Sequence, residues 1–536
     1  MKLKNTLLFF MFLWSFALYA QDWKAYPYTP SGSLVEFPLD EGRHIGEPIE
    51  WWYTTGHVTG QTSGKEYSYM LTYFYYPQSI FDGFRILNVT DHDTGTFYQD
   101  VLPVNYTHLS TTQFNIEAQV YLGALESWKN KLDGSSNPIP FEYEVYATGG
   151  SITLDIEMET LKRPLILGDD GFLNQGSVNY TYYYSQTSNA VSGSLTVDGT
   201  TENIIGNGWI DRQYGDFNPL TGEKYEWFSL QLSNGMDINL WNIFTPNRTI
   251  PDNDKYRILS AYVDESTQYT TDDFEIERLQ YFCTPDNVNC YSKQWRLTST
   301  DIHDIDVTIT SMHTTTEVQL PFRFFEGAIT ISGTIDGNPV TGVGFTELLH
   351  YYEDPDITIT NPVGFYDVSL PITWDLNNPD DGRPVLYDLE YSIDNQNTFL
   401  PIVSDLSEPT YLWNNPSISE GDEVWFKITA KSIDGVLTNT IVSASASTAT
   451  LTAPSFNPNG VKLYPNPVDD IMTLAFKQPL SSLQYEIIDS KGRLVLSKAT
   501  KNVVVENIDT TNFSQGVYFI RVFSESVEDF IKFVKR

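Results

Sequence analysis

The chain is poor in positive charge and in cysteine, and beyond residue 20 it has no apolar run long enough to cross a membrane. Its 536 residues include 32 Lys and Arg against 69 Asp and Glu, which gives a formal net charge of −37. Nucleic acids and anionic membrane surfaces bind clustered basic side chains, so this balance argues against both as partners. We expect a solvated acidic surface and no transmembrane segment in the mature protein.

Motifs of several common enzyme classes are also missing. The sequence has no Gly-rich phosphate loop, no zinc-type histidine spacing and no Gly-x-Ser-x-Gly elbow, so we expect neither a metal nor a cofactor. The only two cysteines, Cys283 and Cys290, lie close together around a Pro-Asp-Asn turn. In an oxidising compartment they are expected to form a disulfide bond.

Aromatic residues, by contrast, are abundant: the sequence has 34 Tyr, 31 Phe and 12 Trp. Such side chains suit half-buried pleated surfaces, and strand-like runs such as 67–74 and 328–333 recur between turn signals. These features predict an all-β protein. The Glu-Trp-Trp-Tyr motif at 50–53 is echoed by Glu-Trp-Phe at 226–228, which favours a duplicated β-barrel or sandwich.

The first residues have the pattern of an export signal. Lys2 and Lys4 precede an apolar stretch at 7–18 that is too short to span a bilayer comfortably, and Ala20 offers a small residue for cleavage. We therefore predict a signal peptide over residues 1–20. No cysteine follows it that could carry a bacterial lipid anchor.

The C-terminal segment carries a specific set of motifs at 463–467 (Leu-Tyr-Pro-Asn-Pro), 485–489, 516–522 and 532–536. It resembles the C-terminal sorting domain of type IX secretion substrates. The resemblance implies that the type IX machinery is a partner, that this domain is removed, and that the protein is secreted or attached to the outer cell surface after export through the periplasm. The alternative is one more β-sandwich with a basic tail.

A second resemblance covers about 300 residues, from Gly42 to Tyr352. Its motifs resemble those of the lipocalin-like family of bacterial carotenoid hydratases (hydroxyneurosporene synthases) and the predicted secreted hydrolases related to them. The motifs lie at 50–53 with 56–57, 182–185, 208–212, 226–232 and 325–333, and the likeness continues to Glu347.

Together these patterns predict tandem lipocalin-like β-barrels, a fibronectin type III-like β-sandwich and a small β-sandwich sorting domain. Short strands at 372–374, 389–393 and 424–430 have the spacing of the fibronectin-like sandwich. The expected boundaries are 1–20 for the signal peptide, 21–200 and 201–355 for the two lipocalin-like domains, 356–451 for the sandwich, 452–460 for a linker and 461–536 for the sorting domain.

The resemblance also implies a reacting group. The hydratases add water across an isolated C=C bond, which requires an acid that can protonate carbon, and Asp211 matches the acid proposed for that family. In an apolar pocket a carboxylic acid stays protonated to higher pH. Strand alternation places Trp209, Asp211 and Gln213 on one face and Arg212 on the other, so Arg212 would not hold Asp211 ionised. The alternative role of Asp211 is a structural turn or inter-strand acceptor.

Other candidate residues come from the same motifs. We predict that Tyr182 and Tyr184, which share a strand face, orient water or substrate, and that Trp52, Trp209 and Glu50 contact the substrate. In the competing interpretation the tryptophans pack in the core, and His57 is a surface or internally bonded histidine. On that interpretation Glu50, Glu226, Glu326 and Glu347 close barrel ends through hydrogen bonds to backbone amides.

The leading functional hypothesis is an exported hydratase or dehydratase that acts on a lipid, an isoprenoid or a sugar, with its pocket inside or between two barrels. One alternative is a non-catalytic carrier of a small apolar ligand. Another is a surface adhesion protein, which predicts an exposed aromatic patch and no enclosed pocket.

Overall fold

The computed structural model describes residues 23–78, 80–217, 221–320, 323–360, 369–414, 418–419, 422–447, 461–524 and 528–536. Regular structure in these residues is almost entirely β-strand, with a short 3-10 helix at η1 (Leu39–Glu41), so the all-β prediction is confirmed. None of the described helices is long and apolar enough to cross a membrane. The predicted signal peptide at 1–20 and the linker at 452–460 lie outside the described residues.

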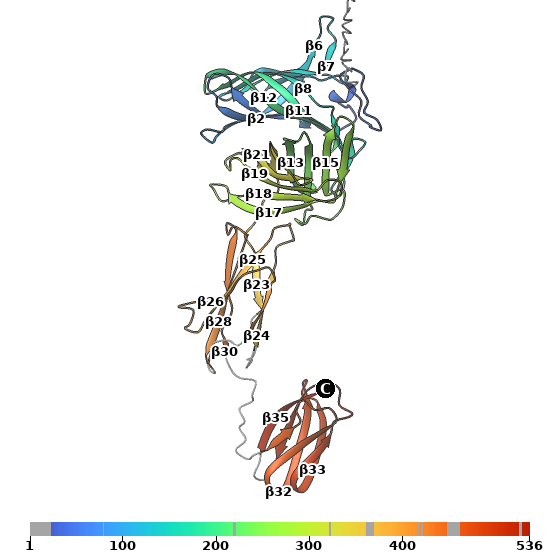
Figure 1. The fold of residues 1–536 in the computed structure, drawn as a ribbon. Helices are drawn as coiled ribbons and strands as arrows, with labels where there is room; N and C mark the ends of the chain where they lie inside the picture. The colour runs from blue at the N-terminus through green and yellow to red at the C-terminus, as the bar shows by residue number, and fades with distance from the viewer. Residues whose placement is uncertain are drawn as a thin grey trace, which may run out of the picture. The chain divides into compact units, whose positions relative to one another are not determined.

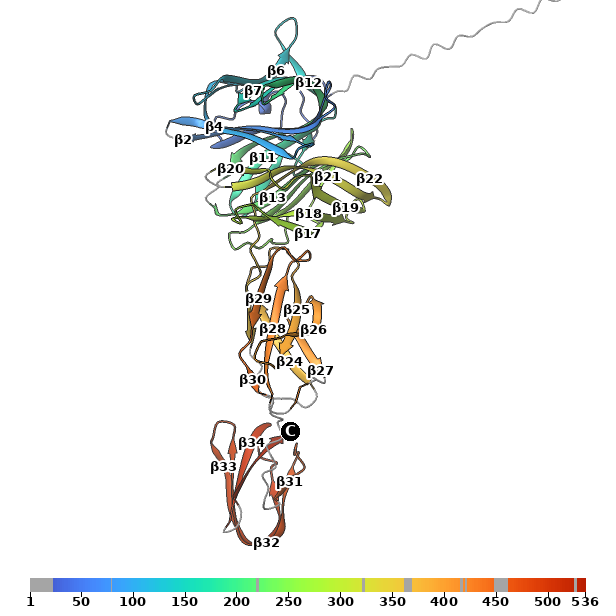
Figure 2. The same ribbon diagram turned by 90° about the vertical axis from the view of Figure 1, so that its left-hand side faces the viewer.

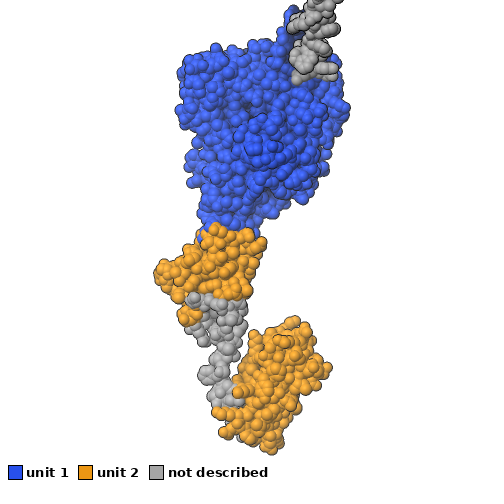
Figure 3. Space-filling model, in the orientation of Figure 1, with its two compact units in different colours: residues 1–357, 376–387, 429–439 blue, residues 358–375, 388–428, 440–536 orange. Residues whose placement is uncertain are grey.

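The chain forms two compact units (Figure 3). The first contains Met1–Ile357, Leu376–Tyr387 and Thr429–Asn439, and the second contains Thr358–Asp375, Asp388–Ile428 and Thr440–Arg536. Two large antiparallel sheets make up most of the first unit, and both ribbon views show them packed one on the other (Figures 1 and 2).

The first sheet is a closed barrel. Pairing runs from β11 through β12 and β1 to β8, and β8 pairs back with β11. The sequence predicts that this domain ends at residue 200, but β12 belongs to the first sheet, because Asp198-Gly199 is only the turn of the β11–β12 hairpin. The strands are β1 (Ile49–Gly60), β2 (Glu66–Gln78), β3 (Phe81–Asp91), β4 (Thr96–Leu109), β5 (Asn115–Val120), β6 (Leu125–Leu132), β7 (Pro138–Gly149), β8 (Ile152–Thr160), β9 (Leu165–Ile166), β10 (Phe172–Gln175), β11 (Asn179–Val197) and β12 (Thr200–Asp216).

The barrel interior is a packed core. Alternate residues of β1 point inward, so Trp52 and Val58 join the core with Trp128 and Tyr143 from the opposite wall. The residues between them, Trp51 and Tyr53 among others, therefore face outward, toward the second sheet.

The second sheet contains strands β13 to β22, and β16 and β17 lie at the two ends of its strand order. Its own core contains Phe228, Trp295 and Ile329. The predicted disulfide is confirmed: Cys283 and Cys290 are paired residues at the ends of β17 and β18. The strands are β13 (Lys224–Leu232), β14 (Asp237–Phe244), β15 (Arg257–Asp264), β16 (Thr267–Thr271), β17 (Glu275–Cys283), β18 (Cys290–Ser299), β19 (Ile305–Ser311), β20 (Glu317–Gln319), β21 (Arg323–Ile335) and β22 (Asn338–Leu348).

The sequence echo marks matching positions in the two sheets. Glu50 in β1 and Glu226 in β13 are both fully buried, and each forms an ion pair with a buried arginine, Arg212 and Arg278 respectively. Glu50 also accepts a hydrogen bond from the backbone N–H of His44 at 2.8 Å. The sequence predicts that these glutamates bond to backbone amides. In the structure their main partners are instead arginine side chains.

The remaining described strands form smaller sheets (Figure 1). The fibronectin type III-like part pairs β23 (Ile357–Thr360), β24 (Ser369–Leu376) and β27 (Thr410–Asn414) in one sheet. Its other sheet contains β25 (Leu386–Ser392), β26 (Leu400–Leu406), β28 (Glu423–Lys431), β29 (Thr438–Val442) and β30 (Ala446–Ser447). The last sheet contains β31 (Lys462–Tyr464), β32 (Ile471–Asp489), β33 (Leu494–Asp509), β34 (Gly516–Phe523) and β35 (Glu528–Lys535).

Candidate functional site

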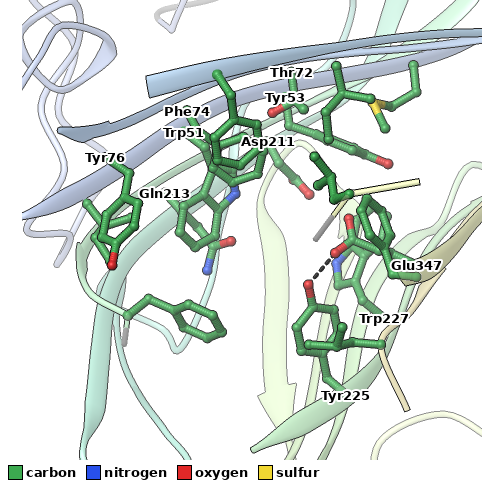
Figure 4. Close-up of a pocket in the computed structure, with 18 of the residues that line it drawn as sticks. Trp51, Tyr53, Thr72, Phe74, Tyr76, Asp211, Gln213, Tyr225, Trp227 and Glu347 are labelled. Atoms are coloured by element: carbon green, nitrogen blue, oxygen red, sulfur yellow. Dashed lines mark hydrogen bonds between the residues drawn. The ribbon is translucent and has the colours of Figure 1, made fainter. Parts of the chain in front are cut away.

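An inter-sheet cavity of about 200 Å³ lies between the outer face of the barrel and the second sheet (Figure 4). Its walls are mainly aromatic and aliphatic, and the described lining residues include no Lys, Arg or His. The first sheet contributes Ile49, Trp51, Tyr53, Met70, Thr72, Phe74, Tyr76, Phe84, Ile86, Tyr183, Asp211 and Gln213. The lining is completed by Phe217, Tyr225, Trp227, Trp241, Leu320, Phe324, Glu347 and Leu349.

Asp211, in the middle of β12, is the cavity carboxyl of the first sheet and is only 2% exposed. Its Oδ1 accepts hydrogen bonds from Ser185 Oγ at 2.5 Å and from Trp209 Nε1 at 2.7 Å. Its Oδ2 accepts one from Tyr183 OH at 2.7 Å. Ser185 is directly opposite Asp211 in the β11–β12 register, so strand pairing itself positions this donor.

The hydrogen bonds continue into the second sheet. Asn239 of β14 donates from Nδ2 to Tyr183 OH at 2.8 Å and to Ser185 Oγ at 3.1 Å. Its Oδ1 accepts a hydrogen bond from Trp227 Nε1 at 3.2 Å. Asn239 therefore fixes both hydroxyl groups that bond to Asp211, and ties the two walls of the cavity together.

Burial determines the proton affinity of Asp211. Removal from water raises the pKa of this carboxyl from 3.8 to about 7, although the hydrogen bonds from Ser185, Tyr183 and Trp209 act in the opposite direction. The negative charge of Glu347 raises the pKa further. Near neutral pH both the acid and the carboxylate are therefore populated, as general acid–base chemistry requires.

A second carboxyl centre lies on the other wall. Glu326 and Glu347 are paired residues of β21 and β22, and Glu347 lines the cavity. Tyr53 OH donates to Glu326 Oε1 at 2.8 Å, and Tyr225 OH donates to Glu347 Oε1. Burial raises the pKa of Glu347, while burial and the neighbouring charge of Glu347 raise the pKa of Glu326. We call Glu326 and Glu347 the carboxyl pair.

Comparison with known proteins identifies the family of this chain. The AttH-like family profile matches residues 28–351, more than half of the chain. The chain belongs to the AttH-like family. Residues 462–536 match the secretion system C-terminal sorting domain, which indicates export followed by secretion or attachment at the cell surface.

Individual relatives of this AttH-like chain are distant. Kievitone hydratase of Fusarium solani subsp. phaseoli is 24% identical over 323 residues, covering 56% of this chain and 82% of the relative. The crystal structure of an AttH-type protein from Nitrosomonas europaea has a TM-score of 0.50 and 22% identity, and the match covers 61% of this chain and 100% of that one. Kievitone hydratase from Nectria haematococca gives a TM-score of 0.47 and 20% identity, with 60% and 98% covered.

Five of the predicted catalytic and substrate-binding residues do not line the cavity of this AttH-like chain. One of them, Trp209, still donates to Asp211. Tyr182 stacks on Tyr214 with ring centroids 5.0 Å apart, and Tyr184 packs in a separate aromatic cluster against Phe37. The remaining two are Trp52, which belongs to the barrel core, and Glu50, which pairs with Arg212. On β11 the prediction identified two residues that share a face, but that face points away from Asp211.

The functional neighbours that the sequence prediction missed are Tyr183, Ser185 and Asn239, together with a cavity-facing role for Glu347. The alternation that pairs Tyr182 with Tyr184 equally pairs Tyr183 with Ser185, and a polar Ser in an aromatic strand was the available signal. Across the described residues, no group of three or more His, Cys, Asp and Glu side chains is arranged to hold a metal ion.

Proposed function

We propose that the chain is an exported hydratase or dehydratase that adds water to, or removes it from, a largely apolar substrate held in the inter-sheet cavity. The observation that carries this proposal is the buried Asp211 carboxyl, which has a pKa of about 7 in an aromatic cavity without basic lining residues. The similarity to kievitone hydratase supports the same reaction class.

In the hydration direction Asp211 supplies the proton. Its neutral acid form transfers a proton to one carbon of a C=C bond, and positive charge develops on the other carbon. The faces of Trp51, Tyr53 and Trp227 line the same space, and aromatic quadrupoles stabilise a cation that water cannot reach freely. Water then adds to the cationic carbon, and loss of its proton completes the alcohol.

The cavity walls favour a lipid-like or isoprenoid substrate over a sugar. A sugar would require many polar partners, whereas the lining is mainly aromatic and aliphatic. Two lining groups, Trp241 Nε1 and Thr72 Oγ1, are buried and have no hydrogen-bond partner among the described residues. A substrate with one or two hydroxyl or carbonyl groups would satisfy them.

The test uses the full chain with kievitone and a panel of isoprenoid alkenes, followed by mass spectrometry for gain of one water. We expect Asp211→Asn to fold and to lower turnover by roughly 100-fold or more. The matched control is Glu41→Gln: Glu41 is fully buried with a pKa of about 7 and accepts from Tyr143 at 2.5 Å, but it does not line the cavity. Equal activity of wild type and Asp211→Asn would contradict the proposed role.

The apolar lining also supports a second candidate, a carrier of a small apolar ligand. A carrier would retain such a ligand through purification without changing it, and organic extraction with mass spectrometry would detect it. The adhesion alternative predicted no enclosed pocket, which the inter-sheet cavity argues against.

A further inference from the structure

The carboxyl pair faces Asp211 across the cavity. Asp211 comes from β12 of the first sheet, whereas Glu347 comes from β22 of the second, and both line the same space (Figure 4). Tyr225, which donates to Glu347, also lines the cavity. The titratable groups that face the pair are Tyr53 from β1, Asp211 from β12 and Tyr225 from β13.

The pair is built to hold a single negative charge. Glu326 and Glu347 are directly opposite in the β21–β22 register, and two carboxylates so close and so buried cannot both ionise at neutral pH. Each receives a tyrosine hydroxyl donor, which stabilises the ionised form. Burial and the neighbouring charge of Glu347 raise the pKa of Glu326 well above its usual value, so Glu326 is the member of the pair that keeps its proton.

We propose that Glu347, backed by Glu326, is a second catalytic carboxyl that holds the nucleophilic water and takes its proton, while Asp211 protonates the alkene from the opposite wall. This inference rests on the proposed hydratase function and divides the chemistry between the two sheets.

The step balances without any co-reactant. The O–H bond of the Asp211 acid breaks, and its proton forms a C–H bond using the π electrons of the alkene. The water oxygen then forms a C–O bond to the cationic carbon, and one water proton passes to the Glu347 carboxylate. Release of that proton to solvent and uptake of another by Asp211 restore the starting state, and the reverse sequence is dehydration.

A division of roles fits the opposed walls better than one carboxyl acting twice. If Asp211 alone gave and later accepted the proton, it would also have to bind the water that attacks. Ser185 and Trp209 fill both acceptor positions of its Oδ1, and Tyr183 takes one of the two on Oδ2. The single free position on Oδ2 holds the acid proton and leaves none for the water. Glu347 instead presents a carboxylate from the second sheet, and only Tyr225 bonds to it from the described cavity wall.

The test compares wild type with Glu347→Gln and Glu326→Gln on kievitone or on whichever panel alkene wild type hydrates. We expect Glu347→Gln to lower kcat by roughly 100-fold with KM changed less than about threefold, and Glu326→Gln to lower it less. The wild-type rate should fall on the alkaline side as Asp211 ionises and on the acidic side as the pair becomes fully protonated. In Glu347→Gln the acidic limb should disappear, which a merely structural role would not cause.

Glu41→Gln is again the matched control, and both pH limbs should remain in it. If Glu347→Gln does not fold, Tyr225→Phe serves instead: loss of the donor should raise the pKa of Glu347 and move the acidic limb to higher pH. If Glu347→Gln or Tyr225→Phe has wild-type activity and an unchanged acidic limb, Glu347 is not a catalytic carboxyl. The hydratase proposal would remain intact. Loss of activity in Asp211→Asn but not in Glu347→Gln would contradict the role of Glu347 in the same way. A wild type that hydrates no alkene of the panel would remove both proposals.

Discussion

Asp211 and Arg212 are consecutive residues of β12 whose side chains leave the strand on opposite faces. Arg212 enters the barrel, where it pairs with Glu50 and lies 4.1 Å from the ring centroid of Trp52. Asp211 enters the inter-sheet cavity, and no basic side chain among the described residues hydrogen-bonds to it. One strand therefore supplies a structural cation and an unpaired acid, and alternation keeps them from neutralising each other.

The Glu50–Arg212 pair should be structural. Arg212→Met would leave the fully buried Glu50 without its ion partner, so we expect the free energy of unfolding to fall by roughly 3–5 kcal/mol. Urea denaturation measures this change. Arg296→Met is the control, because the Arg296–Asp306 pair is exposed, is screened by solvent and should contribute far less. A loss in Arg212→Met no larger than in this control would contradict the assignment.

Ser185 should set the acidity of Asp211. Its hydroxyl stabilises the carboxylate, so Ser185→Ala should raise the pKa of Asp211 above about 7 and move the alkaline limb of the pH–rate profile to higher pH. Ser188→Ala, in the same strand but bonded to Asn207, should leave that limb in place. A limb that stays fixed in Ser185→Ala would show that another group governs it.

His57 should make the protein sensitive to acid. Its Nε2 is 3.0 Å from the carbonyl oxygen of Gly344, and burial lowers its pKa from 6.5 to about 4. The unfolded chain therefore binds more protons between these values, so the contribution of His57 is complete above pH 6.5 and is lost as the pH falls toward 4. His57→Asn should reduce the loss of unfolding free energy between pH 8 and pH 5 by about 2 kcal/mol. Parallel pH curves for the two proteins would refute this.

The Cys283–Cys290 disulfide closes a short loop between β17 and β18. Replacement of both cysteines by alanine should lower the free energy of unfolding by about 2.5 kcal/mol, since the unfolded chain loses a loop constraint. Chemical denaturation of the oxidised protein and of the double variant gives the difference. Thiol labelling of the denatured, non-reduced wild type should find no free sulfhydryl, and two labelled cysteines would disprove the bond in solution.

Deletion of 462–536 should block passage to the cell exterior, because this segment is the sorting domain. We expect the truncated protein to remain in the periplasm, and the mature protein outside the cell to lack both this domain and residues 1–20. Cell fractionation followed by intact-mass measurement tests both expectations. An uncut chain in the medium would contradict them.

Pattern and composition were sufficient for the fold class and for part of the site. Alternation placed Trp209, Asp211 and Gln213 on one face of β12, and the structure has Asp211 and Gln213 in the cavity wall with Trp209 bonded to Asp211. The same rule failed on β11, because a period of two identifies residues that share a face without identifying which face meets the cavity.

The remaining partners depend on contacts that no local pattern encodes. Asn239 reaches Tyr183 from another sheet, 56 positions away in the chain. The sequence alone suggested that Glu347 closes a barrel end. What Glu347 faces depends on the pairing of β21 with β22 and on the packing of that sheet against the barrel, and neither can be read from a local pattern. Tertiary packing, rather than propensity, brings these groups together.

Because the acid lies before β13 and the carboxyl pair lies after it, each sheet holds only part of the polar groups of the cavity. A chain divided between β12 and β13 would yield two fragments, neither with a complete site. Co-expression of the two fragments would then act as a complementation system, in which turnover reports reassembly of the sheets. Mutagenesis could likewise diversify one wall for substrate shape while the opposite wall keeps its proton-transfer group.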